Sequence, residues 1–158
     1  SCEKIIGSNI LMTIIKNEDG VINRINSSCI NSHSIGIGND IYISPQSVNN
    51  VIKFLKEDVD LNLNYLTSIT AVDYIEFIEI IYHLFSINKN HRIILKTKCY
   101  EIDNPVIPSI SDLWKGAELQ EREIWDLMGV EFSGHPNMKR VLLWEGFEGH
   151  PLRRNYTG

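Results

Sequence analysis

The sequence predicts an α+β fold, with mixed α and β elements. A small sheet of mostly antiparallel strands with flanking helices is expected first, followed by a helical segment and an extended, irregular C-terminal tail. Short β-branched runs alternate with polar breaks early in the chain, which is the pattern of strands. One stretch among them shows the apolar spacing of a helix. After Pro105 and Pro108 the sequence becomes helical and then unpatterned. We therefore expect an N-terminal α/β domain over residues 1–108 and a helix with a tail over residues 109–158.

The first elements are expected to be short strands followed by one helix. Residues 10–15 and 40–43 are typical of strands or strand ends. Ser44 and Pro45 then mark a helix start, because a hydroxyl N-cap followed by proline at the first helical position is favoured there. Apolar residues follow at i, i+3, i+4 and i+7, which predicts one buried helix face ending near Lys56. These residues are Val48, Val51, Ile52 and Leu55.

Three longer strands should follow this helix. Residues 63–72, 77–87 and 92–99 are rich in Ile, Tyr, Phe and Thr, and polar turns separate them. Residues 88–90, with the sequence Asn-Lys-Asn, are typical of a hairpin turn. The sequence therefore predicts an antiparallel meander in the middle of the chain.

The helical part is expected to begin after Pro108. Residues 109–114 are expected to form a short helix, and residues 117–128 a longer one. Gly129 follows the last apolar position of the longer helix, where a left-handed residue commonly ends a helix. Beyond it, two Gly-His-Pro tripeptides indicate turns in a tail with little regular structure.

The composition excludes several classes of protein. A chain of 158 residues, 43% apolar and 22% charged, is long enough for one hydrophobic core. Its net charge of −5 argues against nucleic-acid binding. No apolar run approaches the roughly 20 residues that cross a bilayer, and we expect no signal peptide. Cys2, Cys29 and Cys99 form no CxxC pair, so reduced thiols are expected rather than a zinc or iron–sulfur site.

The last third of the chain has an opposed distribution of charge. Residues 111–131 hold six acids and two bases, or about −4, whereas residues 133–158 hold two acids and four bases, or about +2. All three tryptophans fall in this part of the chain: Trp114, Trp125 and Trp144. An acidic helix followed by a basic, aromatic tail must pair with itself or with another molecule. Because aromatic residues and arginine are enriched at docking surfaces, a docking role is favoured.

Glu121 lies at the border of the apolar stripe of the 117–128 helix, counting about 100° per residue. An unpaired carboxylate is costly there. We therefore expect Glu121 to form an ion pair with a tail arginine such as Arg140 or Arg153. A general acid or base whose pKa is raised by burial, or a simply exposed carboxylate, are the alternatives. On the other side of the helix an exposed i, i+4 ladder of charges is expected, formed by Glu118, Arg122 and Asp126.

His135 and His150 each stand between glycine and proline, which predicts turn residues whose rings pack or hydrogen-bond locally. Together with Glu121 or Glu123 they could instead ligate a metal, although their spacing fits no zinc motif. A small metal- or acid/base-dependent hydrolase using Glu121, Glu123 and His135 is the stand-alone alternative. No P-loop, GxSxG elbow or Ser/His/Asp arrangement appears. We therefore expect no catalytic, cofactor-binding or metal-binding residue in this chain.

An ordered series of motifs runs from Trp114 to Tyr156. It consists of Glu121-Arg122-Glu123, Trp125-Asp126-Leu127-Met128-Gly129, Gly134-His135-Pro136, Lys139-Arg140 and Gly149-His150-Pro151-Leu152-Arg153-Arg154. This series resembles the 30 kDa subunit family of respiratory complex I, the NADH:quinone oxidoreductase. The part of the chain before the prolines resembles the family only in its expected elements, a helix after a short strand and then a meander. Asn155 stands where the family more often has an acid, which weakens a local ion pair and leaves the resemblance intact.

The resemblance implies a mixed α/β domain with an extended tail in the peripheral arm of the complex. Family members carry no flavin, iron–sulfur cluster or metal, so quinone, flavin and clusters are expected in partner subunits. They pack against the large subunit that helps form the quinone-reducing site, and near a smaller subunit that bears an iron–sulfur cluster. The chain would then be a non-catalytic scaffolding subunit of a proton-translocating NADH:quinone oxidoreductase.

The same resemblance implies a location and a set of docking residues. The chain would be peripheral on the cytoplasmic face of the inner or plasma membrane, or on the matrix or stromal side in an organelle. Related subunits occur in F420H2 dehydrogenases, ferredoxin-dependent photosynthetic complexes and membrane-bound hydrogenases, and these stay as alternatives. The implied docking residues are Glu121, Arg122, Glu123, Trp125, Asp126, His135, Pro136, Lys139, Arg140, Trp144, His150, Pro151, Arg153 and Arg154.

Overall fold

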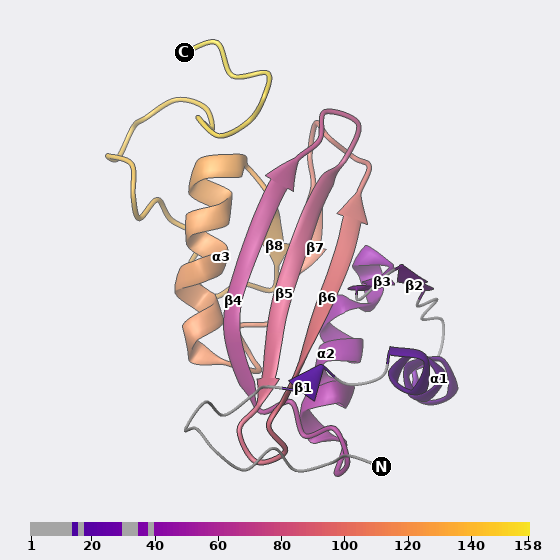
Figure 1. Ribbon diagram of the computed structural model, residues 1–158. Coiled ribbons are helices and arrows are strands. Elements are labelled where there is room, and N and C mark those ends of the chain that lie inside the picture. Colours follow the sequence, from indigo (N-terminus) through magenta and orange to yellow (C-terminus); the bar gives the residue numbers. More distant parts are fainter. Residues whose placement is uncertain (1–13, 16–17, 30–34, 38–39) are drawn as a thin grey trace, which may run out of the picture.

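The computed structural model describes residues 14–15, 18–29, 35–37 and 40–158 (Figure 1). Its elements are β1 (Ile14–Ile15), α1 (Glu18–Ser28), β2 (Ile35–Ile37), β3 (Asp40–Ile43), the 3-10 helix η1 (Pro45–Ser47), α2 (Val48–Glu57), β4 (Tyr65–Asp73), β5 (Ile78–Ser86), β6 (His91–Cys99), β7 (Val106–Pro108), α3 (Lys115–Met128) and β8 (Glu131–Ser133). The chain has a mixed α/β fold with a mostly antiparallel sheet and flanking helices, which confirms the expected class.

The main sheet has the strand order β2-β3-β6-β5-β4, and β1 also pairs with β6. Strands β4, β5 and β6 form the expected antiparallel meander, and β5 pairs with β6 in continuous register. The turn between these two strands covers residues 87–90 and includes the turn predicted at residues 88–90. Strands β1 and β3 run parallel to β6. The pattern of β-branched runs therefore predicted the antiparallel part of the sheet correctly.

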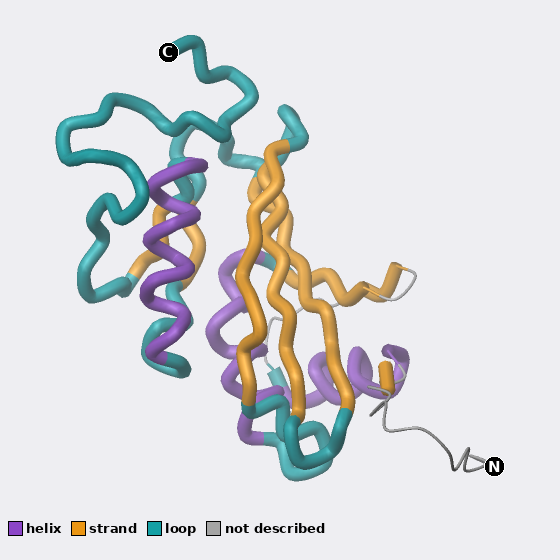
Figure 2. Tube along the Cα trace, turned by 60° about the vertical axis from the view of Figure 1, so that its left-hand side comes forward, coloured by secondary structure: helices purple, strands orange, loops and turns teal. Residues whose placement is uncertain are grey.

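Helices α2 and α3 lie on one side of the main sheet (Figure 2). The residues of α2 that are buried there are those of the predicted stripe: Val48, Val51, Ile52 and Leu55. Alternate residues of β5 enter the same core, namely Ile78, Ile80, Tyr82 and Leu84, because successive side chains of a strand point to opposite faces. Helix α3 packs beside β4, where the side chain of Gln120 accepts the Ile69 N–H at 2.6 Å. This bond gives an acceptor to one backbone N–H on the edge of β4 that pairs with no other strand.

Helix α1 has no counterpart among the expected elements, and of the strand expected at residues 10–15 only β1 lies within the described residues. The sequence of α1 contains Gly20 and several Asn and Ser residues, which have low helix propensity. Tertiary contacts hold this helix. Val21 and Ile25 are buried, and Arg24 donates to Asp58 at 2.8 Å.

The prediction of a short helix at residues 109–114 is wrong, because this segment forms a single turn. The Ser109 N–H donates to the carbonyl of Ser133 at 2.8 Å and so extends the pairing of β7 with β8. The carbonyl of Ser109, which would accept the first bond of a helix, accepts the Asn49 side chain at 2.7 Å instead. Long-range partners therefore take both backbone groups of Ser109, and the carbonyl of Ile110 alone closes a turn with the N–H groups of Leu113 and Trp114.

Helix α3 connects the parallel strands β7 and β8, a pair that the sequence did not indicate. Gly129 ends the helix with a φ of 74°, as predicted, and its N–H donates to the carbonyl of Trp125. The division of the chain at residues 108 and 109 stays a prediction. None of the helices that the structure describes is long and apolar enough to cross a membrane.

Candidate functional site

The carboxylate of Asp126 joins α3 to the tail, which is defined as residues 134–158. Its side chain is fully buried, and Oδ1 accepts a 2.7 Å bond from Nη1 of Arg140. Oδ2 accepts three consecutive backbone N–H groups, those of residues 141–143, at 3.1, 2.8 and 2.9 Å. Burial opposes ionisation, but these hydrogen bonds outweigh it and lower the pKa of Asp126 to about 2. The expected exposure of Asp126 is therefore wrong, because this side of the helix faces the tail.

The guanidinium of Arg140 fills the space between α3 and a loop of the tail. Besides Asp126, it donates through Nη2 to the carbonyls of Phe147 and Gly149 at 2.7 and 2.8 Å. It also lies 5.5 Å from the ring centroid of Trp125 and 5.4 Å from that of Phe147, within cation–π range. One side chain thus holds both ends of the loop against the helix.

Arg122 and Glu123 complete the charged cluster on α3. Arg122 donates to the carbonyls of Lys139 and Arg140 at 3.1 and 3.3 Å, so it binds the tail rather than a helical ladder. Lys139 itself is exposed. Glu123 is half-buried, and within the described part of the chain no hydrogen bond or ion pair is found for it.

Asp73, at the end of β4, holds the last part of the tail. Its Oδ2 accepts the Arg153 side chain at 3.1 Å and the Arg154 N–H at 3.0 Å, while Oδ1 accepts the Ile75 N–H at 2.8 Å. Burial opposes ionisation, but these bonds and the charge of Arg153 outweigh it and lower the pKa of Asp73. Sequence reasoning missed Asp73, because it lies 80 residues before Arg153 and belongs to no local pattern.

Glu121 is buried as its helical position suggested, but its expected arginine partner is wrong. Its Oε2 accepts the Ser109 hydroxyl at 2.6 Å, and Oε1 accepts the Ile110 N–H at 2.8 Å. Burial raises the pKa of Glu121, although these two bonds oppose part of the shift. The alternative of an exposed carboxylate is also wrong, because Glu121 is 0% exposed. Its role is to fix the loop before α3, since Arg140 and Arg153 pair elsewhere.

The His135 ring bonds locally, as predicted for a turn residue. Its Nδ1 accepts the Asn137 N–H at 3.0 Å, so Nε2 carries the proton in the neutral ring and donates to the carbonyl of Glu118 at 2.9 Å. Nε2 lies 4.0 Å from Glu121, which is beyond hydrogen-bond range. Both ring nitrogens are thus occupied by groups of the same chain.

For His150 the predicted local bonding is wrong, because its hydrogen-bond partner, Asp126, lies 24 residues away along the chain. Its Nδ1 donates to the carbonyl of Asp126 at 3.0 Å, and its ring packs edge-on against Trp125 at 5.8 Å between centroids. Gly129 leaves room for this ring, because a Cβ there would lie 2.7 Å from it. Across the described residues, no group of three or more His, Cys, Asp or Glu side chains could hold a metal ion. The histidines therefore support the turns of the tail.

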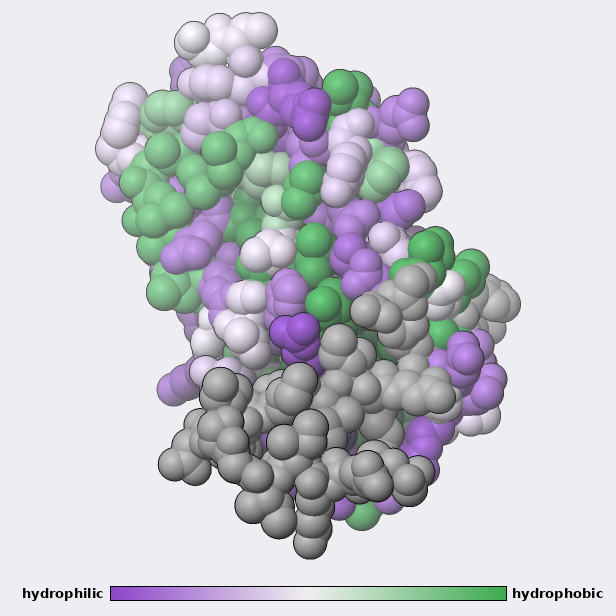
Figure 3. Space-filling view, viewed as in Figure 1, coloured by the Kyte–Doolittle hydropathy of each residue, from purple (hydrophilic) through white to green (hydrophobic). Residues whose placement is uncertain are grey.

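Although the tail is bound to α3 and to the end of β4, several of its large apolar side chains point outward. Leu142 is 57% exposed, Trp144 69% and Leu152 57%. Pro136 is also exposed, and Pro151, next to Leu152 in the chain, is half-buried. Figure 3 shows hydrophobic side chains gathered over the tail and α3, at the upper left. An irregular segment that is fixed by polar contacts and presents apolar groups has the character of a docking surface.

The family model and two known proteins are similar to this chain in sequence. The family model described as respiratory-chain NADH dehydrogenase, 30 Kd subunit, matches residues 41–158. One subunit of the NADH-quinone oxidoreductase of Roseiflexus sp. (strain RS-1) is 41% identical over 118 residues, covering 73% of this chain and 67% of that protein. The mitochondrial NADH-ubiquinone oxidoreductase 30.4 kDa subunit of Neurospora crassa is 44% identical over 119 residues, covering 73% of this chain and 41% of that protein. The chain thus spans about two thirds of the bacterial relative and less than half of the fungal one.

A similar fold occurs in a solved respiratory complex. A chain in the structure of the membrane-bound sulfane sulfur reductase, an archaeal respiratory membrane complex, superposes with a TM-score of 0.64 and 22% sequence identity. The match covers 82% of this chain and 78% of that chain. At this level of identity the likeness concerns the fold alone.

Proposed function

The chain belongs to the 30 kDa subunit family of respiratory-chain NADH dehydrogenase, and from this we propose that it is a non-catalytic peripheral-arm subunit of a proton-translocating NADH:quinone oxidoreductase. Its task is to hold the large quinone-site subunit in position, next to the cluster-bearing subunit, while electrons pass to quinone. Flavin, iron–sulfur clusters and quinone are then bound by the partner subunits. The chain reaches the cytoplasmic face of the membrane, or the matrix or stromal side in an organelle, through the complex.

The observation that carries this proposal is the fixed shape of a tail whose apolar groups are exposed. Arg140 is bonded to Asp126, and Arg153 to Asp73, at the two ends of the loop that presents Leu142, Trp144 and Leu152. Association is costly when a loop must first be ordered. Because its own contacts hold this loop, a partner can bury the apolar side chains with little loss of chain entropy.

Truncating the tail would be a poor test, because it changes the folded body as well. Removing Arg140 and Arg153 leaves the buried carboxylates of Asp126 and Asp73 without their cations. An uncompensated buried charge costs about 3–5 kcal/mol. Loss of assembly after truncation would therefore not separate docking from folding.

Substitutions on the outer surface of the tail separate the two. We expect the double variant Leu142→Asp with Trp144→Asp to keep the thermal midpoint of the wild type but to lose the large quinone-site partner when a tagged chain is purified from membranes. The matched control is Val59→Asp, on an 83% exposed apolar residue before β4, which should co-purify normally. Normal assembly and quinone reduction with the tail variant would contradict the proposed docking.

A further inference from the structure

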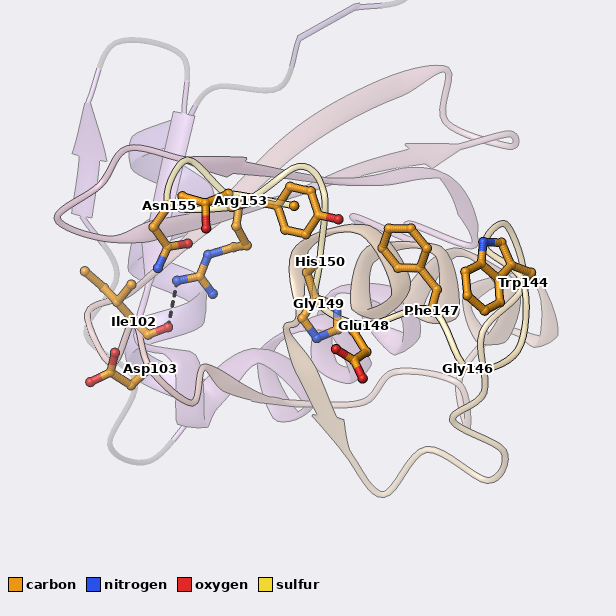
Figure 4. Close-up of a pocket in the computed structure, with 13 residues that line it drawn as sticks. Ile102, Asp103, Trp144, Gly146, Phe147, Glu148, Gly149, His150, Arg153 and Asn155 are labelled. Atoms are coloured by element: carbon orange, nitrogen blue, oxygen red, sulfur yellow. Dashed lines mark hydrogen bonds between the residues drawn. The ribbon is translucent and has the colours of Figure 1, made fainter.

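A cavity of about 800 Å³ opens between the tail and the loop that follows β6. Its walls come from Ile102 and Asp103 on one side and from residues 144–158 on the other. Figure 4 shows Glu148 next to His150 in the middle of this cavity, with Phe147 to one side and Asp103 beyond Arg153 on the other. We call this cavity the tail pocket. It lies on the same part of the tail as the exposed Trp144.

The charge that the tail pocket presents is opposite to the charge of the tail sequence. Arg153 donates to Asp73 and Arg154 to the carbonyl of Asp73, while Arg140 is bound to Asp126. The charges of Arg140 and Arg153 are therefore compensated within the chain, whereas the exposed Arg154 keeps its charge but does not line the pocket. Two acids of the pocket, Asp103 and Glu148, stay exposed, and no hydrogen bond or ion pair is found for either among the described residues. A tail that counts about +2 in sequence thus offers carboxylates to a neighbour.

The other groups of the tail pocket also suit a cation. Phe147 and Tyr156 are stacked, with centroids 6.3 Å apart and planes at 23°, and aromatic faces attract guanidinium and ammonium groups. Because Nδ1 of His150 donates to a carbonyl, Nε2 of the neutral ring is left as a hydrogen-bond acceptor. Glu148 and the imidazole acceptor beside it match the donors of an arginine or lysine side chain. Asp103, beyond Arg153 on the other side, adds a second negative charge to the pocket.

The walls of the tail pocket are held in place before any partner arrives. Arg140 bonds the carbonyls of Phe147 and Gly149, and Arg153 bonds the carbonyl of Ile102 at 2.8 Å. Gly149 has a φ of 83°, and a Cβ there would lie 2.9 Å from the Tyr156 ring. Only glycine fits this close approach easily. The pocket is therefore preorganised, which lowers the entropic cost of binding.

We propose that the tail pocket receives an arginine or lysine side chain of a partner polypeptide. The proposal rests on the docking function above and adds the chemistry of the partner. A polypeptide is favoured over a free small cation because the exposed apolar residue Trp144 forms part of the pocket wall. A partner segment with a basic residue beside apolar ones would fill the pocket and cover Trp144 at the same time.

The test reverses the charge of the pocket in the full chain within its native complex. We expect Glu148→Lys to lower the yield of the co-purified large partner by more than about tenfold, because like charges that face each other across an interface are strongly repelled. Glu148→Gln should give a smaller loss, since it removes the attraction without adding repulsion. The matched control is Glu131→Lys, on an exposed acid of β8 outside the pocket, which should assemble as the wild type does.

Cross-linking identifies what occupies the pocket. With a photo-reactive residue at position 148, we expect cross-links to a partner segment that contains arginine or lysine. Cross-links to a segment without either residue, to a second copy of this chain or within this chain would overturn the proposal, as would normal assembly of Glu148→Lys. If the Leu142→Asp, Trp144→Asp variant loses its partner while Glu148→Lys keeps it, only the basic-ligand proposal fails. If both variants assemble, docking by the tail fails too.

Discussion

Asp126 of helix α3 and Arg140 of the tail form an ion pair of 2.7 Å in which the carboxylate is fully buried. The same carboxylate accepts the N–H groups of residues 141–143, and the same guanidinium donates to the carbonyls of Phe147 and Gly149. One pair of side chains therefore sets the course of the backbone on both sides of the exposed apolar residues. This is how an irregular segment acquires a fixed shape.

Replacing Asp126 by Asn should release this part of the tail. The amide keeps the volume of the side chain but loses the charge that pairs with Arg140 and one of the two acceptor oxygens. We expect the free energy of unfolding to fall by about 3 kcal/mol and the amides of residues 141–143 to exchange faster with deuterium. The control is Glu118→Gln, on a half-buried residue of the same helix, which should change stability by less than about 0.5 kcal/mol. Unchanged exchange in the Asn variant would contradict the anchoring role.

The contribution of Asp126 should also depend on pH with a defined sign. Its pKa is about 2 in the folded chain, whereas an unfolded aspartate has a pKa of about 3.9. The ionised form therefore stabilises the fold above about pH 4, and this contribution is lost as the pH falls through about 2. We expect the difference in unfolding free energy between wild type and Asp126→Asn to shrink over this window. A difference that stays constant from pH 5 to pH 2 would be evidence against it.

Glu121 should show the opposite behaviour. Its pKa is raised by burial, so its contribution to stability is fully present below the unfolded pKa and is lost as the pH rises through the folded value. Glu121→Gln removes the charge but can still accept the Ile110 N–H, so it should be at least as stable as the wild type at pH 7. Glu121→Ala should cost about 1–3 kcal/mol, because the donors of Ser109 and Ile110 lose their acceptor.

The comparison for Glu121 is Glu118→Ala, which should cost less than about 0.5 kcal/mol. Thermal and denaturant unfolding of the three variants at pH 5 and pH 8 measures these differences. Equal losses for Glu121→Ala and Glu118→Ala would show that the bonds to Ser109 and Ile110 contribute little. A Gln variant as unstable as the Ala variant would show that the charge itself is required.

The tip of the β4–β5 hairpin offers a stabilising substitution. Ile75 has a φ of 75°, a left-handed conformation that costs an L-residue with a branched Cβ about 1–2 kcal/mol. The side chain is 63% exposed, so little packing is lost when it is removed. Ile75→Gly should raise the free energy of unfolding by about 0.5–1 kcal/mol, after about 0.5–1 kcal/mol is subtracted for the greater freedom of glycine in the unfolded chain. Denaturant unfolding measures this change.

The control for Ile75 is Ile87→Gly, in the turn after β5, where the residue is 61% exposed and no positive φ is found. Here glycine relieves no strain and only adds freedom to the unfolded chain, so this variant should be less stable than the wild type. Two variants that lose the same stability would show that the tip is not strained.

Local patterns predicted the elements that are themselves local. The apolar spacing of α2, the glycine end of α3 and the meander of β4 to β6 were predicted, because each depends on residues within a few positions of one another. The predicted start was correct only in part, because Pro45 begins η1 rather than α2 and the Ser44 hydroxyl forms no cap hydrogen bond. Helix α1 was missed because tertiary contacts outweigh its weak propensity. The segment at residues 109–114 was mistaken for a helix because the carbonyl of Ser109 accepts a bond from Asn49, which lies 60 residues away in the sequence.

The pairing of charges could not be predicted in the same way. Helical geometry placed Glu121 correctly at the edge of the apolar stripe, but it gave no sign that its partners would be Ser109 and Ile110, in the loop before α3, rather than a tail arginine. Asp126 was expected on the exposed side, because the helix alone gives no sign that the tail folds over it. Asp73 could be recognised as a partner of Arg153 only once β4 and the tail were placed side by side.

Side-chain footprinting of Trp144 measures the proposed docking most directly. Trp144 is 69% exposed, so hydroxyl radicals should oxidise it readily in the isolated chain. In the assembled oxidoreductase the account predicts strong protection of Trp144 and Leu142, relative to the half-exposed Tyr65 at the start of β4. Equal oxidation of Trp144 in the isolated and assembled forms would contradict the claim that the tail binds a neighbouring polypeptide of the complex.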